Sequence, residues 1–172
     1  MYNVRRTSPN SMVRRIPGAV RRHLTGVRRC GTKQGMYIEQ ITPRFGDIDG
    51  LRHVNNTVIP GWFEQARNPI YRIFNPEFAF EGWNLILARY EIDFVRPLVI
   101  NGEVAVQTWV SRIGTSSFEV SQEAVQADVV CTRGKTVLVH FDFGEARPVP
   151  IPEAIRARLR EHEGGKYEGP AR

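Results

Sequence analysis

Residues 45–56, FGDIDGLRHVNN, hold the residue types of this chain that are best suited to chemistry. Asp47 and Asp49 offer carboxylates, His53 offers an imidazole, and two asparagines follow. Carboxylates and imidazoles act as nucleophiles or general bases, and they also bind metals. The segment is therefore a turn, a metal loop or a reaction centre.

The spacing excludes a calcium loop of the EF-hand type. Counted from Asp47, such a loop needs glycine at its sixth position and glutamate at its twelfth, where this chain has Arg52 and Val58. The two cysteines, Cys30 and Cys131, show no spacing typical of zinc sites. We expect no metal.

The residues after the loop predict a helix over 55–74. Apolar side chains recur there near the helical period of 3.6 residues. Asn55 or Asn56 would cap its start, and Pro69 should kink or end it. The first turn of a helix leaves backbone N–H groups free beside the positive end of the dipole, so this tip suits an anion.

The other elements are strands. Residues 36–45 predict one strand, and an alternation of period two from residue 84 onward predicts four antiparallel strands. We expect hairpin turns at Asn101-Gly102 and at 113–115. The last hairpin could turn at Ala127-Asp128 or at Arg133-Gly134; we favour Ala127-Asp128, which matches the strand lengths better and leaves Gly134 as a bulge.

This order of elements describes an α+β domain over residues 36–162, which ends in a short helix and is followed by a flexible tail at 163–172. The long helix is apolar over an arc too wide for a surface helix, so the sheet should wrap around it. Apolar residues on the outer face, such as Trp109 and Leu138, and open edge strands predict a homodimer or larger, joined edge to edge or face to face.

Residues 1–35 form an arginine-rich leader. The first 38 residues hold eight arginines, Lys33 and no acidic residue, a net charge of +9, and residues 39–172 carry −3. Three heptads that begin Val-Arg-Arg lack an apolar stripe, which indicates disorder. The leader is a start-site artefact upstream of Met36, a basic tail for anionic surfaces, or an organellar targeting peptide. We expect no nucleic-acid binding by the folded domain.

Composition indicates a globular protein. With 41% hydrophobic and 24% charged residues, the 172-residue chain can bury the core of one domain. No run approaches the roughly 18 apolar residues of a membrane-spanning helix, so no membrane span is expected. Two isolated cysteines give no disulfide framework, which suits the cytoplasm.

Several stretches, in order, resemble a known family. They are RFGDIDGLRHVNN at 44–56, WFEQAR at 62–67, IDFVRPL at 92–98, NGEV at 101–104 and IGTSSF at 113–118. Together they resemble the hotdog-fold acyl-CoA thioesterases of the 4-hydroxybenzoyl-CoA thioesterase type, and HVNN is similar to the plant acyl-carrier-protein thioesterases. The resemblance covers about residues 36–160 and implies a five-stranded antiparallel sheet wrapped around a long central helix.

The resemblance also implies roles for residues. Asp49 would be the catalytic carboxylate, which attacks the thioester carbonyl or activates water. His53 would position water or orient Asp49, and no cofactor is implied. The backbone of Val54, Asn55 and Asn56 would line the carbonyl oxygen.

For the rest of the substrate, the resemblance implies that a hydroxyl-rich turn lies beside the pantetheine and nucleotide of CoA: Gly114, Thr115, Ser116 and Ser117. Two residues depart from the family pattern. Arg52 stands where relatives commonly have glycine, which affects the conformation of the loop. Ile59 stands where they often have tyrosine, which removes a polar group from the pocket wall.

Some polar residues also have plain structural explanations. Asp47 suits a turn or cap, Glu64 suits pairing with a nearby arginine, although a related hotdog branch uses a helix glutamate, and His140 suits a structural contact. Three arginines would meet CoA phosphates or be solvated: Arg89, Arg112 and Arg147.

We therefore predict a thioesterase that hydrolyses an acyl-CoA or acyl-carrier-protein thioester to a free acid and a thiol, acting as a homodimer or homotetramer. The first alternative is a hotdog protein that binds acyl-CoA without turnover, as a sensor or inactive subunit. The second is a nucleic-acid or membrane binder that works through residues 1–35.

Overall fold

The computed structural model describes residues 31–33 and 35–164. The expectations about residues 1–30 of the leader and 165–172 of the tail lie outside this part of the chain. Gly31–Lys33, assigned to the leader from sequence, instead form strand β1 and pair antiparallel with β2. At the other end, the N–H of Gly164 donates to the carbonyl of Val110 at 3.2 Å, so the start of the predicted tail contacts the sheet.

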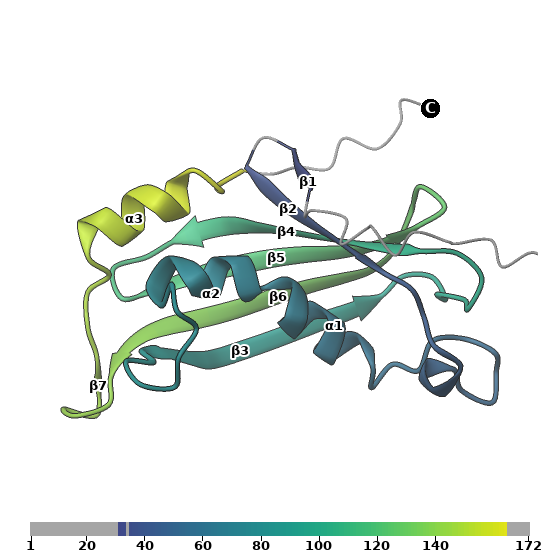
Figure 1. Ribbon diagram of the computed structural model, residues 1–172, viewed down its shortest axis with the longest axis horizontal. Coiled ribbons are helices and arrows are strands. Elements are labelled where there is room, and N and C mark those ends of the chain that lie inside the picture. Colours follow the sequence, from purple (N-terminus) through teal and green to yellow (C-terminus); the bar gives the residue numbers. More distant parts are fainter. Residues whose placement is uncertain (1–30, 34, 165–172) are drawn as a thin grey trace, which may run out of the picture.

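One curled antiparallel sheet forms the body of the molecule (Figure 1). Its further strands are β2 (Met36–Ile41), β3 (Leu85–Phe94), β4 (Val104–Ile113), β5 (Ser117–Gln126), β6 (Val129–Asp142) and the short β7 (Arg147–Pro148). The strand order is β1-β2-β4-β5-β6-β3, and β7 pairs with β6. The predicted α+β hotdog fold, with five main strands curled around a central helical segment, is confirmed.

The position of β3 differs from the prediction. β3 pairs with β6 at an edge of the sheet, whereas β4 pairs with β2 and β5. Asn101-Gly102 is therefore not a hairpin turn but part of a crossover over residues 95–103. The side chain of Gln126 holds this crossover: its Oε1 accepts from the N–H of Val99 and its Nε2 donates to the carbonyl of Val99, both at 2.9 Å. The crossover buries Leu98 in the core. This long-range contact could not be predicted from the local Asn-Gly pair.

The other two predicted hairpins are confirmed. Ala127 and Asp128 join β5 to β6 with φ values of 49° and 61°, as a tight hairpin turn requires. Between β4 and β5, the N–H of Gly114 donates to the carbonyl of Ser117 at 2.7 Å.

Gly134 is not the bulge that was predicted. It pairs in regular register with Gln122 on one side and Ile92 on the other. A Cβ at this position would lie 2.5 Å from Cε2 of Phe63. Glycine is therefore needed so that an aromatic ring of the helix can lie directly on the sheet.

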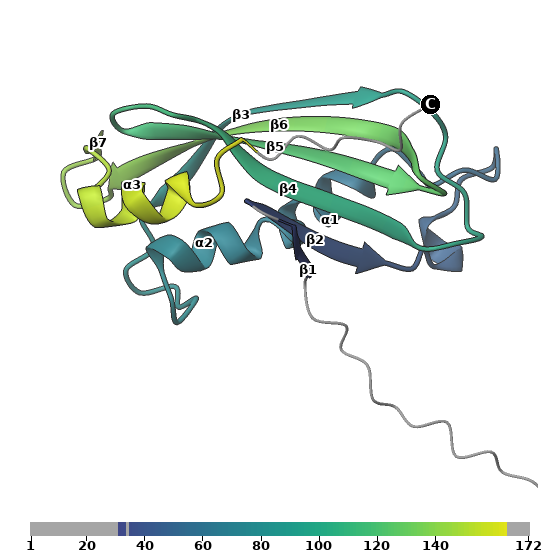
Figure 2. The same ribbon diagram turned by 90° about the horizontal axis from the view of Figure 1, so that it is seen from above.

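The predicted helix over 55–74 is split into α1 (Ile59–Ala66) and α2 (Asn68–Phe74). The break falls at Arg67, and Pro69 lies in the first turn of α2, so the expected interruption by proline is confirmed. Both helices lie on the inner side of the curled sheet (Figure 2). None of the helices in the described part of the chain is long and apolar enough to cross a membrane.

The predicted terminal helix is present as α3 (Glu153–Arg160). It lies at the end of the sheet near α2, where Nη1 of Arg158 donates to the carbonyl of Ile73 at 3.2 Å. The chain that leads to α3 is held by His140, whose Nδ1 lies 3.0 Å from the carbonyl oxygen of Pro150. His140 therefore makes a structural contact.

A buried polar network connects the break between α1 and α2 to the sheet. Arg67 is only 1% exposed. Its Nε donates to the hydroxyl of Tyr71 at 2.9 Å, and its Nη1 donates to Gln122 Oε1 at 3.0 Å and Thr136 Oγ1 at 3.1 Å. Gln122 in turn donates through Nε2 to the carbonyl of Phe63 at 2.8 Å. These bonds satisfy polar groups that would otherwise be buried without partners.

Candidate active site

The loop at 45–56 folds back on itself around Asp49. After a short 3-10 helix, η1 (Phe45–Asp47), Oδ1 of Asp49 accepts hydrogen bonds from the N–H of Leu51 at 2.8 Å and of His53 at 3.1 Å. Arg52 closes the turn with a φ of 66°, a conformation that glycine adopts freely and arginine rarely. The loop closes with arginine in the position where the resembling family commonly has glycine.

Asp49 and His53 line one cavity of about 300 Å³ at the end of the sheet. Asn56 and Ile59 at the helix tip form a second wall, and residues 94–98, at the end of β3 and just after it, form a third. The second carboxylate oxygen of Asp49, Oδ2, accepts no hydrogen bond from any described residue. The structure therefore brings an available carboxylate oxygen, an imidazole and the helix tip to one space.

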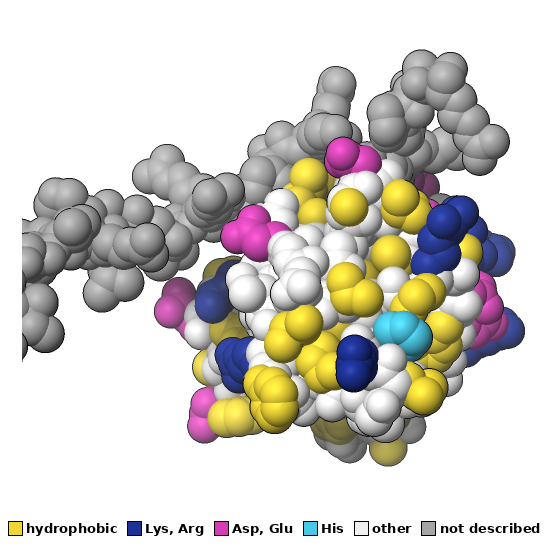
Figure 3. All heavy atoms as spheres, turned by 90° about the vertical axis from the view of Figure 1, so that its right-hand side faces the viewer, with side chains coloured by type: hydrophobic (Ala, Val, Ile, Leu, Met, Phe, Trp, Pro, Cys, Tyr) yellow, Lys and Arg dark blue, Asp and Glu magenta, His cyan; other side chains and the backbone are white. Residues whose placement is uncertain are grey.

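The face of the molecule that holds this cavity carries patches of apolar side chains between polar atoms and several basic side chains (Figure 3). Its large exposed apolar residues come from the loop and from the chain after β3: Phe45, Leu51, Phe94 and Val95. Within the residues that the structure describes, no three histidine, cysteine or acidic side chains gather in a way that could hold a metal ion.

Only one of the three predicted backbone donors is free. The N–H of Val54 donates to the carbonyl of Leu98 at 2.8 Å, and the N–H of Asn55 donates to the carbonyl of Asp47 at 2.7 Å. Contrary to the expectation, neither amide is free, because the amide of Val54 bonds to the crossover and the amide of Asn55 bonds within the loop. The N–H of Asn56 donates to no residue in the described part of the chain.

The helix begins later than predicted. The N-cap of α1 is Val58, without a side-chain cap, so neither Asn55 nor Asn56 has that role. Asn55 instead accepts through Oδ1 from the N–H of Thr57 at 3.0 Å and from its hydroxyl at 2.8 Å. This turn fixes the backbone immediately before α1, including the free N–H of Asn56.

The predicted CoA turn, Gly114 to Ser117, lies far from Asp49 in the same chain (Figure 1). Val104, at the start of β4, packs in the core cluster that contains Val54 and Ile59, whereas Ile113, at its end, packs against a second cluster. A strand as long as β4 spans about 33 Å. One copy of the chain therefore does not bring the turn and the carboxylate together.

The three arginines considered for CoA phosphates differ in their surroundings. Arg89 and Arg147 each form an ion pair with a glutamate two residues away. Arg112 forms no ion pair within the described residues and lines a recess together with Gly114 and Ser117.

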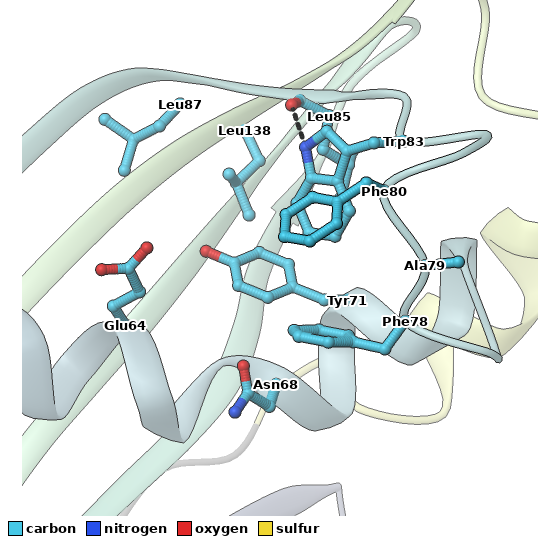
Figure 4. A pocket seen from close by; sticks show the side chains of 10 residues that line it. All are labelled: Glu64, Asn68, Tyr71, Phe78, Ala79, Phe80, Trp83, Leu85, Leu87 and Leu138. Atoms are coloured by element: carbon cyan, nitrogen blue, oxygen red, sulfur yellow. Dashed lines mark hydrogen bonds between the residues drawn. The ribbon is translucent and has the colours of Figure 1, made fainter.

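A larger cavity, of about 550 Å³, lies between the helices and the edge strand β3 (Figure 4). Its walls are mostly aromatic and aliphatic, from Tyr71, Phe78, Phe80, Trp83, Leu85, Leu87 and Leu138, with Glu64 and Asn68 as polar members. Sequence reasoning missed this cavity because its residues come from separate segments. The one available signal was the density of aromatic residues between positions 71 and 83.

Glu64 does not pair with an arginine, contrary to the prediction. Its carboxylate forms no ion pair or hydrogen bond with any residue that the structure describes, and it points into the larger cavity (Figure 4). Arg67, one turn further along, donates to neutral partners instead.

Comparison with known proteins identifies a family. A model of the thioesterase-like superfamily matches residues 43–159, which include the loop, α1, α2 and the strands from β3 to β6. No match is found among curated proteins.

Solved structures show the same likeness. The chain is similar to a protein of Bacillus stearothermophilus described as a predicted thioesterase, with 40% identity and a TM-score of 0.74 over 76% of this chain and 98% of that one. It is also similar to a thioesterase of Thermus thermophilus complexed with coenzyme A and Zn, with 32% identity and a TM-score of 0.67 over 75% and 95% of the two chains. The PA2801 protein of Pseudomonas aeruginosa has 28% identity and a TM-score of 0.61 over 71% and 96%.

Proposed function

Because the chain belongs to the thioesterase-like superfamily, whose general activity is thioester hydrolysis, we propose that it hydrolyses an acyl-CoA with Asp49 as its catalytic carboxylate. The geometry of Asp49 carries this proposal. One carboxylate oxygen is held by the backbone of its own loop, and the other is available in the cavity. A carboxylate fixed in this way meets a substrate atom with little reorganisation.

Two routes use the same atoms. In the direct route, Oδ2 of Asp49 attacks the thioester carbonyl carbon, the C–S bond breaks and the thiolate leaves; water then cleaves the mixed anhydride. In the other, Asp49 takes a proton from the water that attacks this carbon. We favour the direct route, because an ionised carboxylate is a weak base at neutral pH. In both, the N–H of Asn56 supports the negative carbonyl oxygen, and His53 positions water.

We propose that two copies join through their β3 strands. β3 ends the sheet, and an open edge readily pairs with another strand. Joining would cover Leu87, Phe94 and Phe80, which are 47%, 55% and 96% exposed. A two-fold axis between antiparallel strands sets the Phe94 end of one copy against the Leu85 end of the other. Asp49 of one copy would then face the larger cavity of the other, which would hold the acyl group.

The same two-fold arrangement supports CoA as the leaving group. In this arrangement, the Gly114 to Ser117 turn of one copy and Asp49 of the other copy lie at the same end of the dimer. Arg112 lies beside the turn. The similar Thermus thermophilus thioesterase is complexed with coenzyme A. The choice of CoA over a carrier protein and the cytoplasmic location stay predictions.

Thiol release from acyl-CoA substrates of several chain lengths tests the role of Asp49. Asp49→Asn should lower kcat by about 10²–10⁴-fold, because it removes the charge while the amide oxygen can still accept the two loop hydrogen bonds. Asp47→Asn is the matched control, since Oδ2 of Asp47 accepts from the N–H of Arg44 at 2.7 Å. Equal rates for Asp49→Asn and the wild type would remove Asp49 from the mechanism. Binding without turnover by the wild type would establish the non-catalytic alternative.

Mixing two inactive variants tests the shared site. Ala79 lines the larger cavity, so Ala79→Trp should block the cavity and leave Asp49 intact, whereas Asp49→Asn leaves the cavity intact. A mixed dimer then contains one complete site, and an equal mixture of re-associated chains should recover up to about a quarter of the wild-type rate. If each site lies within one copy, mixing will recover nothing.

A further inference from the structure

Arg67 is the largest fully buried side chain among the described residues, and its charge has no acidic partner. All three of its hydrogen bonds go to neutral oxygens, on Tyr71, Gln122 and Thr136. Burying a charge without a counter-ion costs several kcal/mol, and even a buried ion pair can often be replaced by well-packed apolar side chains without loss of stability. Packing alone therefore does not explain an arginine at this position.

The orientation of Arg67 is fixed from the sheet. Gln122 donates through Nε2 to Phe63 and to Thr108 Oγ1, at 2.8 and 3.0 Å, which leaves Oε1 as the atom that faces Arg67. With Nη1 held by Gln122, the Nε–H of Arg67 is directed at Tyr71. An arginine can only donate, so the hydroxyl oxygen of Tyr71 must accept.

The proton of the Tyr71 hydroxyl is therefore available to another acceptor. No residue that the structure describes accepts a hydrogen bond from it. In Figure 4 the hydroxyl points into the larger cavity, toward the space between Glu64 and Leu138. A hydroxyl that accepts a hydrogen bond from a cation is polarised by it, and the hydrogen bond that this hydroxyl donates becomes stronger.

Few other polar groups reach this cavity. The indole N–H of Trp83 is already used, since it donates to the carbonyl of Leu85 at 2.8 Å. Glu64 can only accept when it is ionised. Tyr71 and Asn68 are the remaining donors in a wall that is otherwise aromatic and aliphatic. A site of this kind binds an apolar group and discriminates strongly at the few points where it offers a hydrogen bond.

We infer that Tyr71 determines specificity in the larger cavity and that Arg67 is its positioning residue. The Tyr71 hydroxyl donates a hydrogen bond to an oxygen carried by the acyl group, so the enzyme prefers an acyl group that bears a hydroxyl or oxo oxygen over the hydrocarbon of the same length. This inference rests on the proposed function and adds to it the class of acyl group.

The test compares matched acyl-CoA pairs that differ only by one hydroxyl or oxo group, at several positions along the chain. The measured quantity is the ratio of kcat/KM for the oxygen-bearing substrate to that for its hydrocarbon counterpart. Partial unfolding lowers both terms and leaves the ratio unchanged, so the ratio separates specificity from stability.

Tyr71→Phe should lower this ratio by about fivefold or more for the best position, the factor expected for one lost hydrogen bond. Arg67→Met should lower it in the same direction, because the Tyr71 hydroxyl is then free to rotate. Tyr90→Phe is the matched control: the Tyr90 hydroxyl is buried next to Arg67, like that of Tyr71, but Tyr90 does not line the cavity. It should leave the ratio unchanged.

An unchanged ratio in Tyr71→Phe, or an equal fall in Tyr90→Phe, would overturn the inference while hydrolysis itself stands. If the wild type hydrolyses no acyl-CoA, the proposed function fails. The role of Tyr71 is then tested by calorimetry, which measures the binding of non-hydrolysable thioether analogues of the same matched acyl-CoA pairs. A preference for the oxygen-bearing analogue that Tyr71→Phe abolishes would support the inference. Equal affinity of the wild type for both analogues would overturn it.

Discussion

The loop around Asp49 and the network around Arg67 are two polar centres built in opposite ways. In the loop, the side chains of Asp49 and Asn55 bond to groups two to four residues away, and the bonds are exposed or half-buried. In the network, Arg67 bonds to residues 55 and 69 positions away on two strands, and those bonds are buried. The loop is a local structure that presents a reactive group, whereas the network exists only in the assembled fold.

This difference has energetic consequences. A half-exposed hydrogen bond can be replaced by water, so its loss costs little stability. A buried donor or acceptor without a partner pays its full desolvation cost, and a buried charge loses still more. Substitutions in the network should therefore lower stability, and substitutions in the loop should lower activity.

The largest effect on stability is expected for Gln122→Leu. It removes one of the three acceptors of Arg67 and also the donor to the carbonyl of Phe63, so the unfolding free energy should fall by about 3 kcal/mol. Gln107→Leu is the control, because Gln107 is also buried but its Oε1 has no partner among the described residues, and it should be nearly neutral. Urea unfolding of both variants measures the difference. Equal costs would contradict the distinction between the two centres.

A smaller loss is expected where α1 lies on the sheet. Gly134→Ala would place a Cβ 2.5 Å from the ring of Phe63, and overpacking of this kind costs about 1–3 kcal/mol. Gly61→Ala in α1 serves as control, since its Cβ would meet no atom within 4 Å; it should stabilise the helix by about 0.5–1 kcal/mol. Thermal melting of the two variants should shift in opposite directions, and a shift of both in one direction would be inconsistent with this packing.

On the loop side, Asn55→Ala should affect activity more than stability. It removes the acceptor of both Thr57 hydrogen bonds, which costs about 1 kcal/mol. The turn that places the N–H of Asn56 then loosens, and thiol release should fall by about tenfold, as expected for a small displacement of a catalytic donor. Asn101→Ala is the control, because Asn101 is exposed and its side chain forms no hydrogen bond with a described residue. An unchanged rate would exclude Asn56 as the oxyanion donor.

The smallest effect is expected at His162, a long-range contact that is only half-buried. Its Nε2 lies 2.7 Å from the hydroxyl of Tyr37, and burial lowers the pKa of His162 below its usual value. His162 therefore binds its second ring proton more tightly in the unfolded chain than in the folded protein. The stabilisation is complete above about pH 6.5, the ordinary value for histidine, and is lost as the pH falls toward the lower pKa of the folded state. His162→Gln should flatten this dependence in urea unfolding at about pH 7.5 and 5.5; an identical slope would show that another group causes it.

Features that depend on neighbouring residues could be predicted from the amino-acid order. The alternation after residue 84 predicted the strands, Ala127-Asp128 predicted a hairpin, and Pro69 marked the break between α1 and α2. These features depend on backbone conformation and on hydrogen bonds within a few residues, so the local sequence is enough to predict them. The crowding of Asp49, His53 and Asn56 into one short loop could be predicted for the same reason.

Contacts between distant residues were determined by the folded chain as a whole. Folding placed β3 beside β6 instead of β4, used the amides of Val54 and Asn55 in backbone hydrogen bonds, and separated the 114–117 turn from Asp49. It also assembled the larger cavity and the Arg67 network from segments far apart in the sequence. These outcomes follow from burying Leu98, Phe63 and the other core residues at the same time, a requirement of the whole chain that no local pattern expresses.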